Sequence, residues 1–278
     1  MADILTARAF PVAALAISFF LSPARGAARV EVFYSLPTHS VSLHEPVVMI
    51  FNVRNGSSGI VTLELGQDRK EGFLLEVREP TGTTIQLPQL RHEGISTLGT
   101  VSIQPGQAFT EELLLNEWYN FREVGSYRVS ARLASPISIE GAGNSLQDVS
   151  FSGELSIGAR DPTRLREICD KLEKQTENAT SVEGAQFPAR SLSYVQDPVA
   201  VPYLARLLSD HTLTYDLAIS GLERIGNDAA IEALLFELND KYADIGIMAR
   251  GALERMQERI SNPNLKETVR RELAAKRG

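Results

Sequence analysis

The spacing of apolar residues changes near Asp161-Pro162. Before this point they recur at about every second position in short runs, as in strands, and after it about every 3.6 positions, as in amphipathic helices. A chain of 278 residues also exceeds what one hydrophobic core usually organises. We therefore predict a multidomain protein, all-β in residues 29–158 and all-α in residues 159–278.

The first of these domains contains nine short runs with the strand pattern, separated by turns rich in Gly, Pro and Asn. The runs are Val30–Leu36, Val47–Val53, Ile60–Leu65, Phe73–Val77, Thr84–Leu87, Thr100–Ile103, Phe109–Leu115, Tyr127–Leu133 and Val149–Ile157. Such a set of strands, with turns about every 8 to 12 residues, predicts an immunoglobulin-like β-sandwich.

Two segments carry a resemblance to bacterial immunoglobulin-like and fibronectin-like domains. Val124-Gly125-Ser126-Tyr127-Arg128-Val129 is similar to their penultimate strand, where a Gly-x-Tyr element places the tyrosine in the core and its hydroxyl on the backbone. Leu43–Val47, followed by Asn52–Asn55, resembles their early strand and Asn-bearing turn, including those of a bacterial proteinase-inhibitor sandwich. The resemblance implies strand positions and no particular function.

An internal repeat of about 30 residues organises the helical part. Shifted forward by this length, one set of apolar residues coincides with a second set, and a looser third copy follows. The three sets are Leu192, Val195, Val201, Leu204 and Leu208; Leu222, Ile225, Ile231, Leu234 and Leu238; and Ala249, Leu253, Met256, Val269 and Leu273. Each unit is expected to be two short helices joined by a tight polar turn.

These units resemble short bacterial HEAT-like repeats of the type named from phycobilisome lyases. The resemblance rests on Asp197–Leu204 and Ala218–Gly226. It implies a curved surface for protein contact and no lyase chemistry. One helix pair cannot bury its apolar face alone, so neighbouring pairs are expected to share a core. We also expect a first helix from Pro162 to about Lys174 and a loop over Thr176–Gly184. Leu222 of the middle unit is expected in the core, and the adjacent Glu223 is expected to face solvent.

The N-terminal residues have the layout of a bacterial secretory signal peptide. Arg8 precedes an apolar run from Ala9 to Leu21, and small residues follow at 24 and 26–28. The run is short for a bilayer span, which needs about 20 apolar residues. We expect residues 1–28 to be a signal peptide, no membrane span in the mature chain, and a periplasmic or secreted location.

The residues with reactive side chains form no recognisable catalytic or metal-binding motif. Cys169, the only cysteine, has helical spacing to Leu165 and Leu172 and is interpreted as a buried structural thiol. The four histidines have no zinc-binding spacing; they are His39, His44, His92 and His211. Three further groups are interpreted as turn or surface residues: Gly56–Gly59, the pair Glu111-Glu112, and Asp68 with Glu71. The sequence assigns no catalytic, cofactor-binding or metal-binding residue and predicts no cofactor.

Trp118, the only tryptophan, has two interpretations: packing in the core, which we favour, or an exposed recognition anchor. The net charge of −7 argues against a nucleic-acid partner. We therefore expect an exported, non-enzymatic protein-binding or scaffolding protein that uses its helical repeat surface. The alternatives are a proteinase-inhibitor-like regulator acting through a sandwich loop and a hydrolase with an unrecognised site. The sequence identifies neither the partner nor the binding residues.

The mature chain should begin near Ala27 or Arg29, because small residues flank both positions. N-terminal sequencing of exported material measures this directly. Recovery of the chain with Met1 in a membrane fraction would contradict the signal-peptide interpretation.

Overall fold

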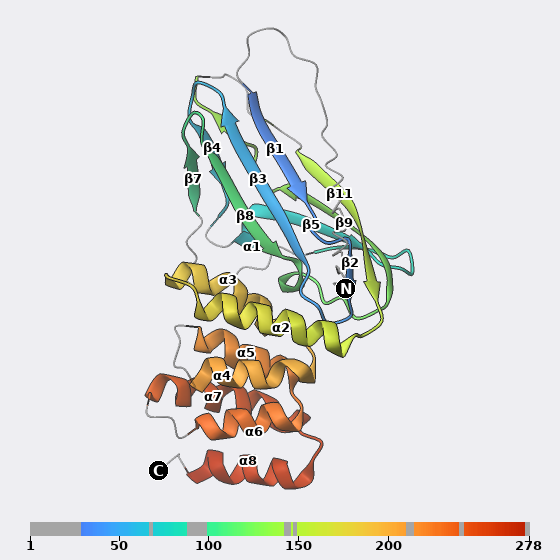
Figure 1. Cartoon of the computed structure of the whole chain (residues 1–278), viewed down its shortest axis with the longest axis vertical. Coiled ribbons are helices and arrows are strands. Elements are labelled where there is room, and N and C mark those ends of the chain that lie inside the picture. The colour runs from blue at the N-terminus through green and yellow to red at the C-terminus, as the bar shows by residue number, and fades with distance from the viewer. Residues whose placement is uncertain are drawn as a thin grey trace, which may run out of the picture.

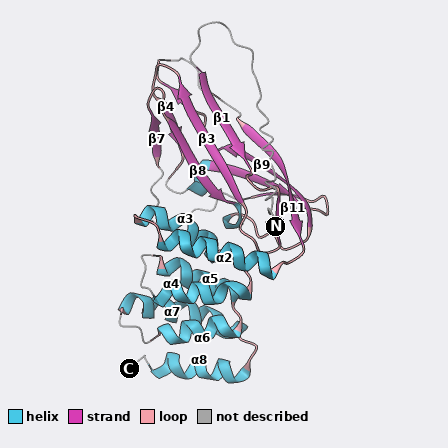
Figure 2. Ribbon diagram, in the orientation of Figure 1, coloured by secondary structure: helices cyan, strands magenta, loops and turns pink. Residues whose placement is uncertain are grey.

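The structure is a computed structural model, and it describes residues 29–66, 69–87, 99–141, 146, 149–209, 214–238 and 242–275. The expected signal peptide at 1–28 lies outside these residues, as do Asp68, His92 and His211. A region of strands is followed by a region of helices, which extends away from the strands in a stack (Figures 1 and 2). The coarser prediction, sheets followed by helices, is confirmed.

The strand region, residues 29–158, contains all nine predicted strands and two short additional ones. Its strands are β1 (Arg29–Ser35), β2 (Ser40–Ser42), β3 (Val48–Gly56), β4 (Val61–Glu64), β5 (Phe73–Arg78), β6 (Thr84–Gln86), β7 (Thr100–Ile103), β8 (Ala108–Leu114), β9 (Gly125–Leu133), β10 (Ser138–Ile139) and β11 (Ser150–Gly158). A four-residue helix, α1 (Arg69–Gly72), precedes β5, and a 3-10 turn, η1 (Leu115–Glu117), follows β8.

The strands form three sheets around one core. Their orders are β1-β3-β8, β10-β4-β7 and β2-β11-β9-β5-β6; β2 pairs with β11 in parallel, and the other pairs are antiparallel. Alternate residues of β3 point inward, where Met49, Phe51 and Val53 are fully buried. Phe51 meets Phe73 of β5 edge to face, with ring centroids 5.1 Å apart. Because β3 and β5 belong to different sheets, this contact joins the two sheets through the core.

Tyr127 has the arrangement expected for the tyrosine of the Gly-x-Tyr element. Its side chain is 2% exposed, and its hydroxyl donates to the carbonyl oxygen of Glu123 at 3.0 Å. Asn55, in the predicted Asn-bearing turn, is also fully buried. Its Nδ2 donates to the carbonyl oxygens of Gly59 and Ile103, each at 2.8 Å, so one amide group joins the turn after β3 to β7.

The helical region, residues 162–275, consists of helices in two layers. The helices are α2 (Pro162–Glu177), α3 (Val182–Ser193), α4 (Val201–Ser209), α5 (Tyr215–Ile225), α6 (Asp228–Glu237), α7 (Ala243–Met256) and α8 (Pro263–Ala275), with 3-10 turns η2 (Pro198–Ala200) and η3 (Gln257–Arg259). One layer is α2, α4, α6 and α8, and the other is α3, α5 and α7 (Figure 1). Among the described residues, no helix combines the length and apolar character needed to cross a bilayer.

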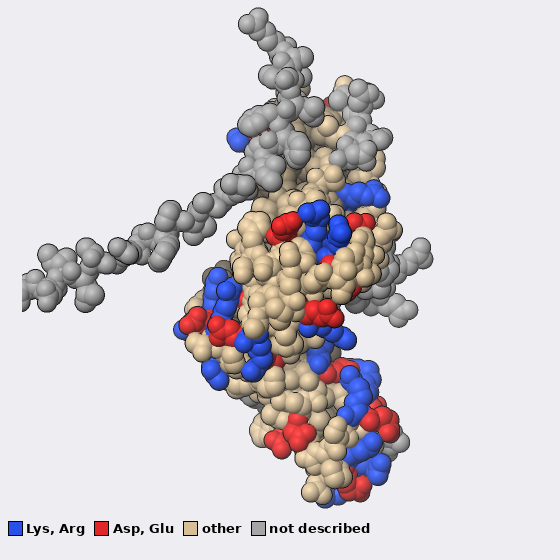
Figure 3. Space-filling view, turned by 90° about the vertical axis from the view of Figure 1, so that its right-hand side faces the viewer, with Lys and Arg blue, Asp and Glu red and all other residues tan. Residues whose placement is uncertain are grey.

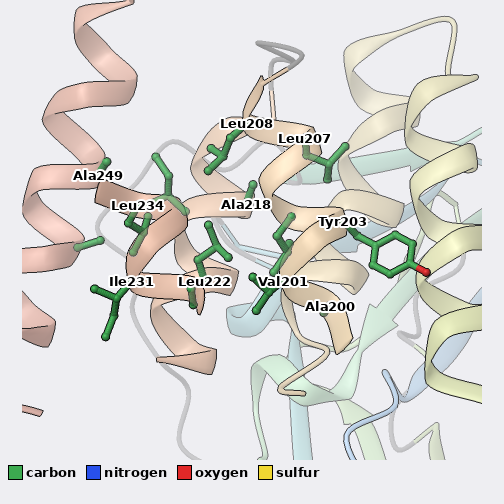
Figure 4. Close-up of a cluster of buried hydrophobic side chains, with 14 of the residues drawn as sticks. Ala200, Val201, Tyr203, Leu207, Leu208, Ala218, Leu222, Ile231, Leu234 and Ala249 are labelled. Atoms are coloured by element: carbon green, nitrogen blue, oxygen red, sulfur yellow. The ribbon is translucent and has the colours of Figure 1, made fainter. Parts of the chain in front are cut away.

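The repeated apolar residues lie between these layers. Leu192, Leu222 and Leu253, which the repeat aligns, are each fully buried. Side chains from α4, α5 and α6, including Leu222 and Ile231, converge in this core (Figure 4). A side-chain oxygen also caps each of the three tight turns within the repeats, because Asp197, Asn227 and Asn262 each accept from a backbone N–H two or three residues ahead.

Two expectations about the helices were wrong. Most of the polar segment Thr176–Gly184 is helical, and only residues 178–181 connect α2 to α3. Its polar groups support helix ends: Thr176 donates to the carbonyl oxygen of Leu172, and Ser181 accepts from the N–H of Gly184 to cap α3. Glu223, next to Leu222, was expected to face solvent, but its side chain is only 20% exposed. Its carboxylate accepts from Arg255 of α7 at 2.8 and 2.7 Å.

Two helix glycines test how closely neighbouring helices pack. A methyl group added at Gly221 of α5 would lie 2.9 Å from the Cα of Ser193 in α3, whereas one added at Gly251 of α7 would meet only the flexible end of Arg255, at 3.3 Å. Gly221→Ala should therefore lower the free energy of unfolding by about 1 to 3 kcal/mol. Gly251→Ala should raise it by about 0.5 to 1 kcal/mol, the usual gain from replacing a helix glycine. Urea unfolding followed at 222 nm measures both, and equal shifts of the same sign would contradict the close packing of α3 on α5.

Candidate functional site

Hydrogen bonds and ion pairs join the strand region to the helical region at the junction between them. Only residues 159–161 connect β11 to α2. Asp161 caps α2, since its carboxylate accepts from the N–H groups of Thr163 and Arg164 at 3.0 and 3.1 Å. Its own N–H donates at 2.9 Å to the hydroxyl of Ser42, at the end of β2. The residue that starts the helical region is thereby fixed to the strand region.

A buried carboxylate forms the second tie. Residues 42–45 make a β-turn in which the N–H of Glu45 donates to the carbonyl oxygen of Ser42 at 3.0 Å. The Glu45 carboxylate accepts from the N–H of Ser42 at 2.8 Å and from Nη2 of Arg164 in α2 at 2.9 Å. Glu45 is only 9% exposed. A carboxylate with this little solvent needs such partners, so Arg164 and the turn stabilise each other across the junction.

The third tie joins Arg160 to Asp197, the residue that caps η2. Nη2 of Arg160 lies 2.9 Å from Oδ1 of Asp197, and Nε contacts Oδ2, so the pair is bidentate. The Asp197 side chain is 1% exposed and that of Arg160 is 45% exposed. Burial by itself raises the pKa of Asp197, but hydrogen bonds from Arg160 and from the N–H of Val199 outweigh it and hold the pKa below its ordinary value.

Residues on either side of Trp118 make a second set of contacts between the strand and helical regions. Glu117 is 3.6 Å from Arg190 of α3, and Nδ2 of Asn120 lies 3.1 Å from Oε1 of Gln196, just before η2. Trp118 is 8% exposed and belongs to the core of the strand region. The core interpretation of Trp118 therefore agrees with its burial, and its neighbours in sequence hold the helical region.

The residues weighed for chemistry do not come together. Cys169 is fully buried, and burial raises the pKa of its thiol to about 12, so the reactive thiolate is not formed at neutral pH. His39 and His44 are separate from it in the strand region. Ser57 donates to Oδ1 of Asn55 at 2.6 Å within the turn after β3. Glu111 and Glu112 lie on β8, and Glu71 lies on α1. Within the described ranges, no three His, Cys, Asp or Glu side chains are placed to hold a metal ion.

The described chain has two notable surface hollows. One, of about 210 Å³, lies beside Pro136 and Ile137 in the strand region. The other, of about 500 Å³, is an open depression along α2. It is lined by Glu167, Asp170, Lys171, Lys174, Gln175 and Asn178. Pockets for small molecules usually have volumes of about 300 to 1,000 Å³ and enclose most of the ligand. The first hollow is smaller than this, and the second is too open to enclose a ligand.

Charges of both signs are mixed over the helical region in the view of Figure 3, with no extended patch of one sign. A nucleic-acid-binding surface gathers Lys and Arg to neutralise phosphates. Several of the basic side chains here are paired with carboxylates on neighbouring helices, as Arg206 is with Glu173 at 2.7 Å. On the face in view, Lys and Arg do not gather in this way.

Sequence reasoning did not identify this junction. Leu43–Val47 resembles an early strand and Asp197–Leu204 resembles part of a helical repeat, but neither segment indicates contact with the other. The only local signal was Asp161-Pro162, which correctly predicted the start of α2.

Comparisons with known proteins found no matching family model and no matching curated protein. Similar solved structures include a variant β-glucosidase from Listeria innocua in complex with laminaribiose, with 15% sequence identity and a TM-score of 0.28. A β-glucosidase from Erythrobacter marinus has 13% identity and a TM-score of 0.25. The sporulation control protein Spo0M from Bacillus subtilis has 15% identity and a TM-score of 0.26.

These similarities cover 48%, 47% and 53% of this chain, respectively. They span 16% of each β-glucosidase and 56% of Spo0M. Scores this low support no inference about fold or function.

Two ion pairs allow a matched test of the junction. Asp197→Asn keeps the capping oxygen but removes the charge that Arg160 binds, so it should lower the free energy of unfolding by about 1 to 3 kcal/mol. Glu154→Gln breaks the pair of Glu154 with Arg128, whose side chains are 69% and 52% exposed, and should change it by less than about 0.5 kcal/mol. Urea unfolding at pH 7 measures both.

The pKa of Asp197 is lowered in the folded protein. The extra free energy of unfolding of the wild type over Asp197→Asn is therefore fully present above the ordinary aspartate pKa of 3.8. It is lost as the pH falls through the folded-state pKa. An Asp197→Asn effect no larger than that of Glu154→Gln would show that the buried pair does not stabilise the junction.

Proposed function

We propose that this protein is an exported bacterial binding or scaffolding protein without enzymatic activity, which holds a protein partner on its helical region. The observation that carries the proposal is the bonded junction, which fixes a layered stack of helices to a separate body of strands (Figure 1). A surface held in one orientation loses little conformational freedom on binding, and this favours a role in recognition.

The strand order supports an immunoglobulin-like domain as part of the proposal. The first strand, β1, pairs with β3, and the next strand, β2, runs parallel to the last strand, β11. These pairings are compatible with the variable-type arrangement of immunoglobulin domains. The order β11-β9-β5-β6 also matches one sheet of that arrangement. The hydrogen bond from Tyr127 to Glu123 corresponds to the tyrosine corner of such domains. With Cys169 as the only cysteine, the domain has no internal disulfide, and aromatic contacts such as Phe51 on Phe73 occupy its core.

The layered helices support the HEAT-like part of the proposal. Each predicted unit is a helix, a capped tight turn and a second helix, as in α5–α6 and α7–α8. Stacking the units places one helix of each in each layer, so every unit offers a helix to either face. Export rests on residues 1–28, and with it the periplasmic or secreted location.

Exposed apolar side chains on the two regions provide a test of which region binds. Phe236 of α6 and Ile247 of α7 are 78% and 65% exposed, and Phe33 of β1 is 50% exposed. The mature chain is used as bait in an extract of the native organism, and the captured protein is then purified and titrated against each variant. A double variant, Phe236→Glu with Ile247→Glu, should weaken binding by about tenfold or more, because loss of a hot-spot side chain from an interface costs about 2 kcal/mol or more.

Phe33→Glu is the matched control and should leave the affinity unchanged. Loss of binding in Phe33→Glu alone would place the site on the strand region and favour the inhibitor-like alternative. Circular dichroism of all three proteins confirms that the substitutions leave the fold intact.

A further inference from the structure

Four of the seven exposed large apolar side chains of the described chain lie where α6 ends and α7 begins. They are Phe236 at 78%, Ile247 at 65%, Tyr242 at 48% and Met248 at 36% exposure. The two helices meet closely here, because a methyl group added at Gly246 of α7 would lie 3.3 Å from the carbonyl oxygen of Leu238 and 3.6 Å from that of Glu237. Phe236 and Ile247 are next in sequence to these contacting residues. We call the surface formed by the four side chains the α6–α7 corner.

The outward side of α6 is unusually apolar for a surface helix. Three inward residues are buried in the helical core: Ala230, Ile231 and Leu234. Beyond the charged residue at its start, the helix exposes Ala229, Glu232 and Phe236. The terminal helix α8, in contrast, exposes Glu267, Arg270 and Arg271. A helix with apolar residues on all sides is normally covered by other parts of a structure. The outward side of α6 therefore has the character of a contact surface.

Two acidic side chains border this corner. Glu232 precedes Phe236 by one turn of α6, and Asp244 precedes Met248 by one turn of α7, so each pair shares a face of its helix. Both carboxylates are exposed, and neither has a hydrogen-bond or ion-pair partner among the residues that the structure describes. Other carboxylates of the stack are paired with arginines of neighbouring helices. In a chain with a net charge of −7, this unneutralised negative charge attracts a cationic partner and repels an anionic one.

The secondary structure of the corner restricts the form of the partner. An extended peptide adds its main chain to a free sheet edge, but the backbone groups of α6 and α7 are bonded within their own helices. The partner must therefore present side chains. An amphipathic helix presents apolar side chains at intervals of three and four residues along one face, with charged residues beside them. Its apolar face matches the corner, and basic residues beside that face match Glu232 and Asp244.

We propose that the α6–α7 corner binds a basic amphipathic helix of a protein partner. The four apolar side chains of the corner contact the apolar face of this helix, and Glu232 and Asp244 pair with its Lys or Arg residues. This inference rests on the proposed function, because it names the class of partner that the helical region holds.

Model peptides test the proposal. The probe is a fluorescein-labelled peptide of about 18 residues, long enough for a helix, with Leu and Lys on opposite faces. A second peptide has Glu in place of Lys, and a third has the same Leu and Lys residues reordered to remove the helical period. Fluorescence anisotropy with the full mature chain should show that the Leu–Lys helix binds at least about tenfold more tightly than either control peptide. Equal binding of the Leu–Glu peptide, or no binding of the Leu–Lys helix, would overturn the proposal.

Two double variants assign the binding to the corner. Phe236→Ala with Ile247→Ala should weaken binding of the Leu–Lys helix by about tenfold or more, because apolar contacts are lost. Glu232→Gln with Asp244→Asn should weaken binding severalfold at low salt and make the affinity less dependent on the NaCl concentration, because charges at the rim of an interface act at long range. Circular dichroism confirms that each variant keeps its helices.

The matched control is Glu31→Gln with Glu154→Gln, which removes two exposed carboxylates from the strand region and changes the net charge equally. This variant should alter the affinity by less than about twofold, because its charges lie away from the corner. An effect as large as that of Glu232→Gln with Asp244→Asn would show attraction to the net charge alone and refute the corner as the site.

The native partner separates a failure of this inference from a failure of the proposed function. A partner captured with the mature chain and displaced by the Leu–Lys helix supports both. A partner that requires Phe236 and Ile247 but is not displaced would leave the helical region as the binding region and overturn only the basic-helix inference. Sedimentation with phosphatidylcholine vesicles that depends on the same two residues would assign the corner to a lipid surface and also overturn the inference.

Discussion

A pair of helices cannot bury its apolar face alone, and the arrangement of this protein depends on that constraint. Each helix pair is covered by its neighbours, so the two ends of the stack need other solutions. At one end the strand region is joined to α2 and to the start of η2 through the polar ties at Asp161, Glu45 and Asp197. At the other end α8 buries Leu265, Val269 and Leu273 and turns its charged residues outward. The strand region thus lies against the first helix pair, while α8 forms the free end of the stack (Figure 1).

The local pattern of the sequence was sufficient to predict most elements of this fold. Nine runs with apolar residues at alternate positions became nine strands, because alternate burial is a property of each strand by itself. The two additional strands, β2 and β10, have three and two residues and are too short to show a period. The boundary of α2 was predicted because Asp161 and Pro162 act locally. The loop predicted over Thr176–Gly184 was mostly wrong, because Thr176 and Ser181 bond to the helix ends and stabilise them.

The candidate site was beyond sequence reasoning for a physical reason. Its contacts join residues far apart in the chain: Ser42 and Asp161 are 119 positions apart, and Arg160 and Asp197 are 37 apart. A single sequence gives no sign that a given Arg meets a given Asp, since both are usually solvated. The same limit explains the error at Glu223. Its position beside Leu222 predicted an exposed side chain, but Arg255 of α7, the neighbouring helix in the same layer, pairs with it.

The polar character of the junction explains how it specifies one orientation of the two regions. An apolar contact between the two regions would not depend on pH, whereas this one places the carboxylates of Glu45 and Asp197 out of solvent and satisfies them with arginines. Such pairs add little net stability compared with apolar packing, but breaking one partner is costly because the other is left buried and uncompensated. The orientation of the helical region is therefore specified sharply as long as each charge keeps its partner.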